Sequence, residues 1–256
     1  MSTPDSLRDH DADGGSFPGR MKPRVPILAL KNVGVFYQRR GKEPNWALQD
    51  ISLNLFKGET LGVIGRNGAG KSTLLRLLAG IIRPDTGDYV NHGYQATLLS
   101  LQVGFVGYLS GRENIILSGL LLGIDLSQIK ERIDGIIEFS GLGESIDDPI
   151  DTYSSGMKAR LGFSAAFYVD PDILLVDEVL GVGDAEFVEK STAVMKERIR
   201  SDKTVVLVSH NPNVVRVLCD RAVWIERGKT VAEGPTEEVM EAYRMSQEGS
   251  SKREPL

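Results

Sequence analysis

Eight consecutive residues, Gly65-Arg66-Asn67-Gly68-Ala69-Gly70-Lys71-Ser72, have the types and spacing that bind nucleotide phosphates. The glycines let backbone N–H groups turn toward phosphate oxygens, where a Cβ would obstruct the approach. The segment follows the apolar run Leu61–Ile64 and opens a helical pattern near Lys71, whose positive dipole end adds to the same spot. We expect all eight residues and Thr73 to bind the nucleotide, with Lys71 on the β- and γ-phosphates and the Ser72 hydroxyl on Mg²⁺.

Two carboxylates follow a second apolar run of strand length. Asp177 and Glu178 come directly after Ile173–Val176, a pattern typical of a buried parallel strand. Ligands bind at the carboxyl ends of such strands. Because neighbours on a strand point to opposite sides, we expect Asp177 to hold Mg²⁺ through water while Glu178 faces a water near the γ-phosphate. Glu178 would orient and polarise that water as the general base.

A histidine ends the next apolar run. His210 follows Thr204–Ser209, and a lone histidine is usually structural or exposed. After the strand that succeeds Asp177 and Glu178, however, it is placed to donate a hydrogen bond to a γ-phosphate oxygen or to the attacking water. The predicted catalytic set is therefore Lys71, Glu178 and His210.

A second anion site is predicted at Tyr153-Ser154-Ser155-Gly156-Met157. Two serines and a glycine open a helix, where free backbone N–H groups, hydroxyls and the helix dipole favour an anion. In isolation the same residues would be read as an ordinary helix N-cap. The segment starts about 80 residues beyond the first loop, so one chain carries two candidate phosphate-binding surfaces.

Strands must precede the phosphate loop. Ile27–Tyr37 and Trp46–Phe56 show stretches of period-2 alternation, with a turn at Lys57–Glu59 before Leu61, which predicts an antiparallel β layer feeding the next strand. Tyr37 and Trp46 are both candidates to stack on an adenine ring, and a core or edge role is open for either.

The next segment, from residue 97 to about 170, predicts helices. Ser110 and Glu113 match a capping box, and isoleucines at helical spacing over 129–137 precede Gly141 and Gly143, which end that helix. We expect a helical subdomain over about 103–170, inserted into the sheet domain.

The remaining chain predicts an alternating α/β order. A helix over Glu186–Arg200, strands over Arg221–Glu226 and Lys229–Glu233, and a helix over Thr236–Met245 follow. Residues 1–25 are poor in apolar side chains and predict a disordered arm, and residues 246–256 predict a flexible tail. The expected fold class is α/β, over residues 26–245.

Composition excludes several classes of protein. The net charge of −5 and pI near 5.4 argue against a protein whose main task is to grip nucleic acid. A single cysteine, Cys219, excludes an internal disulfide and predicts a small buried side chain. No run of eighteen apolar residues and no signal peptide are present, so we expect a cytoplasmic protein that reaches membranes through a partner.

These motifs, in this order, resemble the nucleotide-binding subunit of an ATP-binding cassette (ABC) transporter over roughly residues 27–245. The resemblance implies a P-loop NTPase core with a mainly parallel sheet, an N-terminal antiparallel β subdomain and an inserted helical subdomain. It implies that ATP and Mg²⁺ bind between two copies arranged head to tail, each closing the other's site with Ser154, Ser155 and Gly156. It also identifies Gly181-Val182-Gly183-Asp184 as the D-loop and His210 as the switch histidine, and it places Tyr37 where the adenine-stacking aromatic is expected.

Departures from the common pattern narrow the resemblance. The Tyr-Ser-Ser-Gly-Met variant, the Leu180–Asp184 D-loop and the Leu109–Asn114 segment are similar to ATPases that export O-antigens, capsules or teichoic acids. The resemblance implies an integral membrane permease as partner and a position at the cytoplasmic face of the inner membrane. Proteins of this family have a glutamine-bearing loop that contacts Mg²⁺, the nucleotide site and the permease. In this sequence Gln102 is favoured for that position, with Ser100 as the alternative.

Three other functions compete with this interpretation. A soluble ABC ATPase acting on nucleic acid or ribosomes usually has two cassettes or long coiled-coil arms, and neither is present here. A transporter for another cargo fits the signature motif less well. A P-loop kinase or GTPase would leave Tyr153–Met157 and His210 unexplained.

Overall fold

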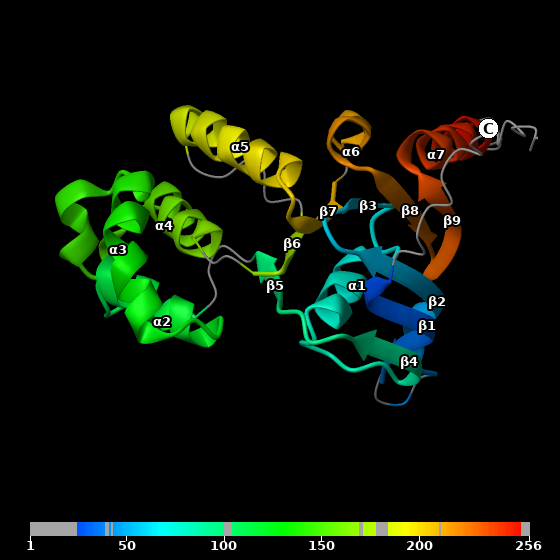
Figure 1. Cartoon of the computed structure of the whole chain (residues 1–256), viewed down its shortest axis with the longest axis horizontal. Coiled ribbons are helices and arrows are strands. Elements are labelled where there is room, and N and C mark those ends of the chain that lie inside the picture. Colours follow the sequence, from blue (N-terminus) through cyan, green and yellow to red (C-terminus); the bar gives the residue numbers. More distant parts are fainter. Residues whose placement is uncertain are drawn as a thin grey trace, which may run out of the picture.

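A computed structural model describes residues 25–38, 41, 43–99, 104–168, 171–177, 184–209 and 211–251. Apart from Val25, the arm predicted over residues 1–25 lies outside these ranges, and so do residues 252–256. The described ranges contain two sheets and a separate group of helices, which Figure 1 shows at the left. The predicted α/β fold class is confirmed.

The first sheet is antiparallel, as the sequence predicts, but it has three strands rather than two. Its order is β2-β1-β4, with β1 at Pro26–Tyr37, β2 at Asn45–Phe56 and β4 at Thr86–Asn91. The third strand, β4, was not predicted because its sequence Thr-Gly-Asp-Tyr-Val-Asn is polar and mostly exposed. Strand β4 pairs with one edge of β1, and β2 pairs with the other edge.

The second sheet has six strands in the order β5-β6-β7-β3-β8-β9. Its strands are β3 Thr60–Ile64, β5 Ala96–Leu99, β6 Ile173–Asp177, β7 Thr204–Val208, β8 Arg221–Glu226 and β9 Lys229–Pro235. All neighbouring pairs are parallel except β8 with β9. Strand β5 corrects the expectation that residues from 97 onward are helical. The strands preceding the phosphate loop and the carboxylates, β3 and β6, lie on either side of β7, so their carboxyl ends share one edge.

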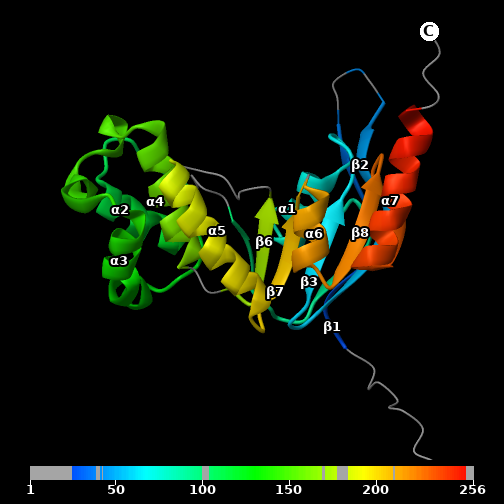
Figure 2. The same ribbon diagram turned by 90° about the horizontal axis from the view of Figure 1, so that it is seen from above.

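The two faces of the six-stranded sheet are covered differently. Alternate residues of β6 separate between two apolar clusters: Ile173 and Leu175 join the one that includes α1 (Lys71–Leu78), while Leu174 and Val176 join the other. This alternation is the period of a strand buried on both faces. Helix α1 packs between the two sheets. The opposite face carries α5 (Ala185–Arg200), α6 (Pro212–Leu218) and α7 (Thr236–Ser251) (Figure 2).

The helical subdomain has a core of its own. It comprises α2 (Gly111–Leu121), α3 (Leu126–Ser140), two short 3-10 turns and α4 (Ser155–Phe167). Ile115, Ile129 and Leu161 are among the buried residues of its apolar cluster. The predicted capping box is present, since Ser110 accepts a hydrogen bond from the N–H of Glu113 and the Glu113 side chain accepts from the N–H of Ser110.

Several helix and strand ends differ from the prediction. Helix α7 continues to Ser251 instead of ending at Met245, so the residues from 246 to 251 are helical rather than part of a polar tail. Helix α6 was not predicted, although Asn211 caps it and Pro212 occupies its first position.

Cys219 is the small buried side chain that the sequence predicts. It is 8% exposed, and burial raises the pKa of its thiol to about 12.

Candidate functional site

The loop between β3 and α1 has the backbone that the glycine spacing predicts. Gly68 and Gly70 have positive φ values of 77° and 109°, a region that glycine enters without steric cost. A Cβ on Gly70 would also lie 2.5 Å from the carbonyl oxygen of Ala47. Glycine is therefore required at Gly70 both by conformation and by the close approach of β2.

Lys71 begins α1 and turns back over this loop. Its side chain is 7% exposed, and Nζ donates hydrogen bonds to the carbonyl oxygens of Gly65 at 2.8 Å and Arg66 at 2.9 Å. The ammonium group is thus held inside the curve of the loop, together with the N-terminal end of the helix. A cation and a positive dipole end at one place favour a phosphate group.

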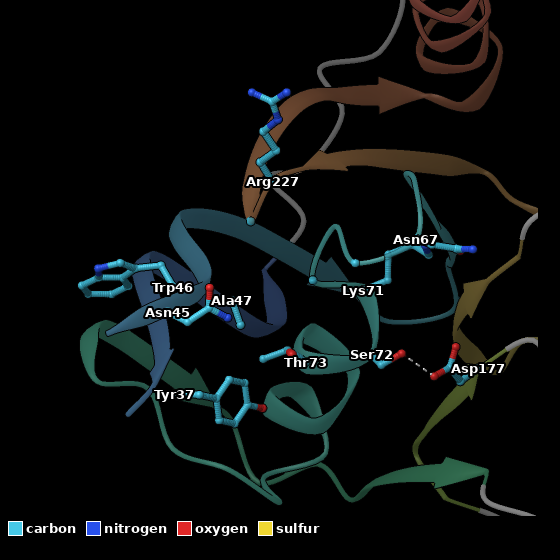
Figure 3. Close-up of a pocket in the computed structure, with 13 residues that line it drawn as sticks. Tyr37, Asn45, Trp46, Ala47, Asn67, Lys71, Ser72, Thr73, Asp177 and Arg227 are labelled. Carbon is cyan, nitrogen blue, oxygen red and sulfur yellow. Dashed lines mark hydrogen bonds between the residues drawn. The ribbon is translucent and has the colours of Figure 1, made fainter. Parts of the chain in front are cut away.

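Ser72 and Asp177 meet across 105 residues of sequence. Ser72 Oγ donates a hydrogen bond of 2.9 Å to Asp177 Oδ2, because α1 and the carboxyl end of β6 lie at the same edge of the sheet (Figure 3). A hydroxyl and a carboxylate are hard oxygen ligands, and Mg²⁺ in phosphate sites takes one or two of these besides water and phosphate oxygens. The two residues fit the predicted ion. When bound, Mg²⁺ would neutralise charge that develops on the phosphates.

A cavity of about 520 Å³ opens beside this loop. It is lined by Tyr37, Asn45, Trp46, Ala47, Asn67, Gly68, Gly70, Lys71, Ser72, Thr73, Asp177, Arg227 and Gly228. Six of the nine predicted residues over 65–73 therefore line one space, while Arg66 is exposed and Gly65 and Ala69 are buried. Figure 3 shows the lining residues coming from both sheets and from α1.

Four lining residues were not predicted as site residues: Asn45, Ala47, Arg227 and Gly228. The turn between β8 and β9 reaches the phosphate loop through backbone hydrogen bonds, in which the N–H of Gly228 donates to the carbonyl of Ala69 at 2.9 Å. The N–H of Gln49 in β2 donates to the carbonyl of Gly228 at 2.7 Å. The Arg227-Gly228 pair has the sequence of a turn, but nothing local in the sequence says which loop it touches.

Both aromatic candidates for adenine stacking line the cavity. Tyr37 and Trp46 are each 41% exposed. The Trp46 ring packs edge-to-face on Phe36, with centroids 5.2 Å apart. In Figure 3 the Tyr37 ring lies on the side of Thr73, whereas the Trp46 indole stands at the far end of the cavity from Asp177. The choice of Tyr37 stays a prediction, and the packing on Phe36 gives Trp46 a structural role.

The second predicted anion site is at the start of α4. Ser154 is the N-cap and accepts a hydrogen bond of 3.1 Å from the N–H of Met157, while Ser154 and Ser155 are both exposed. Tyr153 just before them is 6% exposed, its hydroxyl donates to the carbonyl of Ser145, and burial raises its pKa. Tyr153 therefore fixes the segment to the helical subdomain, while the two serines that follow it are exposed.

The two predicted anion sites lie on different parts of the molecule. Helix α1 packs between the sheets, while α4 belongs to the helical subdomain, and both views separate them (Figures 1 and 2). Within the described chain, no residue of the 153–157 segment lines the cavity. A nucleotide in that cavity would therefore meet only the first site of its own chain.

Several predicted residues lie outside the described ranges: Ser100, Gln102, Glu178, the 181–183 part of the D-loop, and His210. Asp184 is described. It caps α5 by accepting a hydrogen bond from the N–H of Phe187 at 2.9 Å, and this bond, with Arg160 nearby, holds the pKa of Asp184 below its usual range. Among the described helices, none is long and apolar enough to cross a membrane.

A family model described as "ABC transporter" matches residues 48–181. That match extends from β2 through the phosphate loop, the helical subdomain and β6. The chain belongs to the ABC transporter family.

Curated relatives of this ABC protein share up to half of its residues over the matched length. The O-antigen export system ATP-binding protein RfbB of Klebsiella pneumoniae is 48% identical over 78% of this chain and 81% of its own length. A Myxococcus xanthus protein of the same name is 50% identical over 77% of this chain. The teichoic acids export ATP-binding protein TagH of Lactococcus lactis is 46% identical over 77% of this chain. The chain spans only 45% and 42% of the length of the last two relatives.

Solved structures support the fold of the ABC protein. Its structure matches the ATP-binding cassette MJ0796, in a dimeric post-hydrolysis state bound to ADP and Pi, with a TM-score of 0.69 and 24% identity. This match covers 82% of this chain and 99% of the other. An ATP-binding subunit of an ABC transporter matches with a TM-score of 0.70, 20% identity and coverage of 85% and 93%. At these identities the likeness establishes the fold alone.

Proposed function

We propose that this protein is the ATP-hydrolysing subunit of a transporter that exports a cell-surface polysaccharide, or its lipid-linked form, through a membrane permease. The observation that carries the proposal is the pairing of a complete phosphate loop with the exposed serines Ser154 and Ser155, which begin a helix on another part of the chain. The cargo class, O-antigen, capsule or teichoic acid, rests on the similarity to the RfbB and TagH exporter proteins.

The described residues divide the work of binding ATP. Lys71, which Gly65 holds inside the loop, and the glycine-rich backbone would bind the phosphates, while the adjacent Ser72 and Asp177 would hold Mg²⁺. The cavity's aromatic rim receives the adenine, with Tyr37 as the proposed stacking residue. Glu178, next after Asp177, is the proposed general base for the attacking water, and His210 the proposed γ-phosphate contact. Gln102 is proposed to join the Mg²⁺ site.

A second copy of the chain would complete each site. Ser154, Ser155 and Gly156 open α4 with exposed hydroxyls and N–H groups that no phosphate of the same chain reaches. In a head-to-tail dimer they would close on the nucleotide held by the partner's loop. ATP binding would then drive assembly, and hydrolysis would release it. We propose that this cycle moves a permease at the cytoplasmic face of the inner membrane, with no nucleic acid involved.

Two substitutions test the catalytic assignment in the purified protein. Lys71→Ala should abolish ATP turnover, because it removes the buried ammonium from the phosphate loop. Glu178→Gln should still bind ATP and should accumulate as an ATP-bound dimer, seen by size-exclusion chromatography with light scattering. Lys130→Ala, an exposed lysine on α3, is the control and should turn over ATP like the wild type. Wild-type turnover by Glu178→Gln would refute the role of Glu178.

The cargo needs a cellular test. In a strain lacking the gene, the wild-type protein should restore surface polysaccharide and Lys71→Ala should not, as measured by gel profile of the extracted glycan. The protein should also co-purify with a membrane permease. Co-purification with ribosomes or DNA would instead favour a soluble ABC ATPase, and an unchanged glycan profile would favour another cargo.

A further inference from the structure

Arg160 connects three helices, α3 and α4 of the helical subdomain and α5 of the sheet domain. It lies in α4, one turn after Gly156, and its side chain is 25% exposed. The guanidinium donates from Nε to the carbonyl of Ser140 at 2.8 Å and from Nη2 to the carbonyl of Gly141 at 2.9 Å. From Nη1 it donates to Oδ2 of Asp184 at 3.2 Å. Nothing in the sequence motifs assigns this residue a role.

The two carbonyls belong to the C-terminal end of α3. Helix ends leave such carbonyls without partners inside the helix, and a guanidinium can satisfy two of them while its charge complements the dipole. Gly141 ends α3 with a φ of 61°, and a Cβ there would collide with Nη2 of Arg160. Glycine at this position thus makes room for the arginine. Arg160 is fitted to the end of α3 by shape as well as by charge.

The third contact reaches the residue that begins α5. Asp184 uses Oδ1 to accept from the N–H of Phe187 at 2.9 Å and Oδ2 to accept from Arg160. The guanidinium carbon also lies 5.6 Å from the centre of the Phe187 ring. Both carboxylate oxygens of Asp184 are therefore engaged, one holding α5 and the other holding α4.

We propose that Arg160 is a positioning residue that locks the start of α4 to Asp184, so that a second copy meets Ser154–Gly156 and the D-loop end as one rigid surface. The inference rests on the proposed head-to-tail dimer. Arg160 itself does not need to touch the nucleotide. Its effect is on assembly of the dimer, and it leaves the phosphate loop of its own chain unchanged.

The same interface offers a matched control. Lys190 in α5 donates from Nζ to the carbonyl of Phe139 at 3.0 Å and lies 4.4 Å from the centre of the Phe139 ring. This cation also joins α5 to the end of α3, but it approaches α3 rather than α4 or Asp184. Replacing Lys190 tests whether any loss of charge at the interface has the same effect.

The experiment measures ATP-driven dimerisation by light scattering in the Glu178→Gln background. Arg160→Gln should raise the protein concentration needed for half-dimerisation at least about tenfold, a typical coupling for residues in one network. ATP affinity of the monomer should stay close to that of the parent. Lys190→Gln should dimerise like the parent. Arg160→Lys, which keeps the charge but has a single nitrogen in place of the three that reach the separate acceptors, should fall in between.

Asp184→Asn tests the link itself, since an asparagine still caps α5 but loses the ion pair. The double variant with Arg160→Gln should be no worse than the more impaired single variant. If the losses of dimerisation in the two single variants multiply in the double variant, the link between Arg160 and Asp184 is overturned. Normal dimerisation by Arg160→Gln would also overturn it. If Arg160→Gln melts early, normal dimerisation by Arg160→Lys would serve as that test. A Glu178→Gln parent that never dimerises with ATP would instead refute the proposed function.

Discussion

Gly156 differs from the glycines of the phosphate loop. At Gly70 a Cβ would clash with the backbone of β2, so the fold requires glycine there. At Gly156 the nearest atom that an added Cβ would meet is Ser154 Oγ, at 3.8 Å, which is ordinary contact. The chain's own packing therefore does not require glycine at Gly156. The open space beside Gly156 can instead admit a group from outside the chain, which the proposed dimer supplies as a phosphate.

This contrast predicts the effect of Gly156→Asp. The protein should fold and bind ATP as a monomer with unchanged affinity, because the substitution fills open space. It should lose ATP-driven dimerisation and most ATP turnover, because a carboxylate would face the partner's phosphates. Fluorescent nucleotide titration, light scattering and a phosphate-release assay measure the three properties.

Ser127→Asp is the matched control for Gly156→Asp. Ser127 is also the second residue of its helix, α3, and it is exposed, so the new carboxylate meets a similar helix end. Its turnover should equal that of the wild type. Equal losses in both variants would mean that added negative charge on the helical subdomain, and not the position of Gly156, causes the defect.

Local and distant contacts explain which site residues the sequence could predict. Lys71 and Ser72 follow the glycines directly, so their place at the loop depends on a few bonds of backbone. Arg227 reaches the same cavity only because β8 and β9 pair and their turn hydrogen-bonds to Ala69. Arg160 is similar: its partners at 140, 141 and 184 come from other elements. Such contacts depend on tertiary packing, for which no local pattern exists.

At the scale of elements, Asn114 organises the entry to α2. Its side chain is fully buried, and Nδ2 donates to the carbonyls of Val106, Leu109 and Ser110 at 2.8 to 3.1 Å. Oδ1 accepts from the N–H of Val106 at 2.7 Å. The Asn114 amide thus hydrogen-bonds to backbone groups of the turn that precedes α2, in addition to the capping box at the N-terminal end of that helix.

Asn114→Ala should therefore destabilise the protein more than Ser110→Ala. Loss of the cap serine should cost about 1 kcal/mol of unfolding free energy. Loss of Asn114 leaves the N–H of Val106 without a partner, which costs about 1–3 kcal/mol, and removes three further hydrogen bonds to carbonyls that each keep a backbone donor. Urea unfolding followed by circular dichroism measures both variants. A smaller loss for Asn114→Ala than for Ser110→Ala would contradict the role of the buried amide.

The elements that the sequence did not predict are short or polar. Strand β5 has four residues and α6 has seven, too few for a periodic pattern to show. Strand β4 carries its pairing in the backbone, since most of its side chains are exposed. The apolar strands β3, β6 and β7 have five residues each, and they were predicted because burial on both faces leaves a continuous apolar run.

At the scale of the whole molecule, the two anion sites belong to parts with separate cores. The helical subdomain packs around its own apolar cluster, while the phosphate loop rests on the cluster between the sheets. Figure 1 shows the two parts side by side, joined near β5 and β6. In the proposed dimer a single chain would present two incomplete surfaces, and only the first would respond to ATP in a monomer.

Hydrogen–deuterium exchange should resolve the two responses in the Glu178→Gln protein. At concentrations where the protein is monomeric, ATP and Mg²⁺ should slow exchange in the phosphate-loop segment 65–73 but leave the segment 153–157 unchanged. At concentrations where it dimerises, both segments should be protected, because the partner's nucleotide then covers the exposed N–H groups at the start of α4.

Gly156→Asp in the same background separates assembly from concentration alone. It should show protection of the phosphate loop at every concentration and none of the segment 153–157, because it binds ATP without closing on a partner. Protection of 153–157 in the monomer would require a contact within one chain between two sites that the structure holds apart. If protection of the segment 153–157 depends on protein concentration and is lost in Gly156→Asp, a second copy is required, since only a partner's nucleotide then reaches α4.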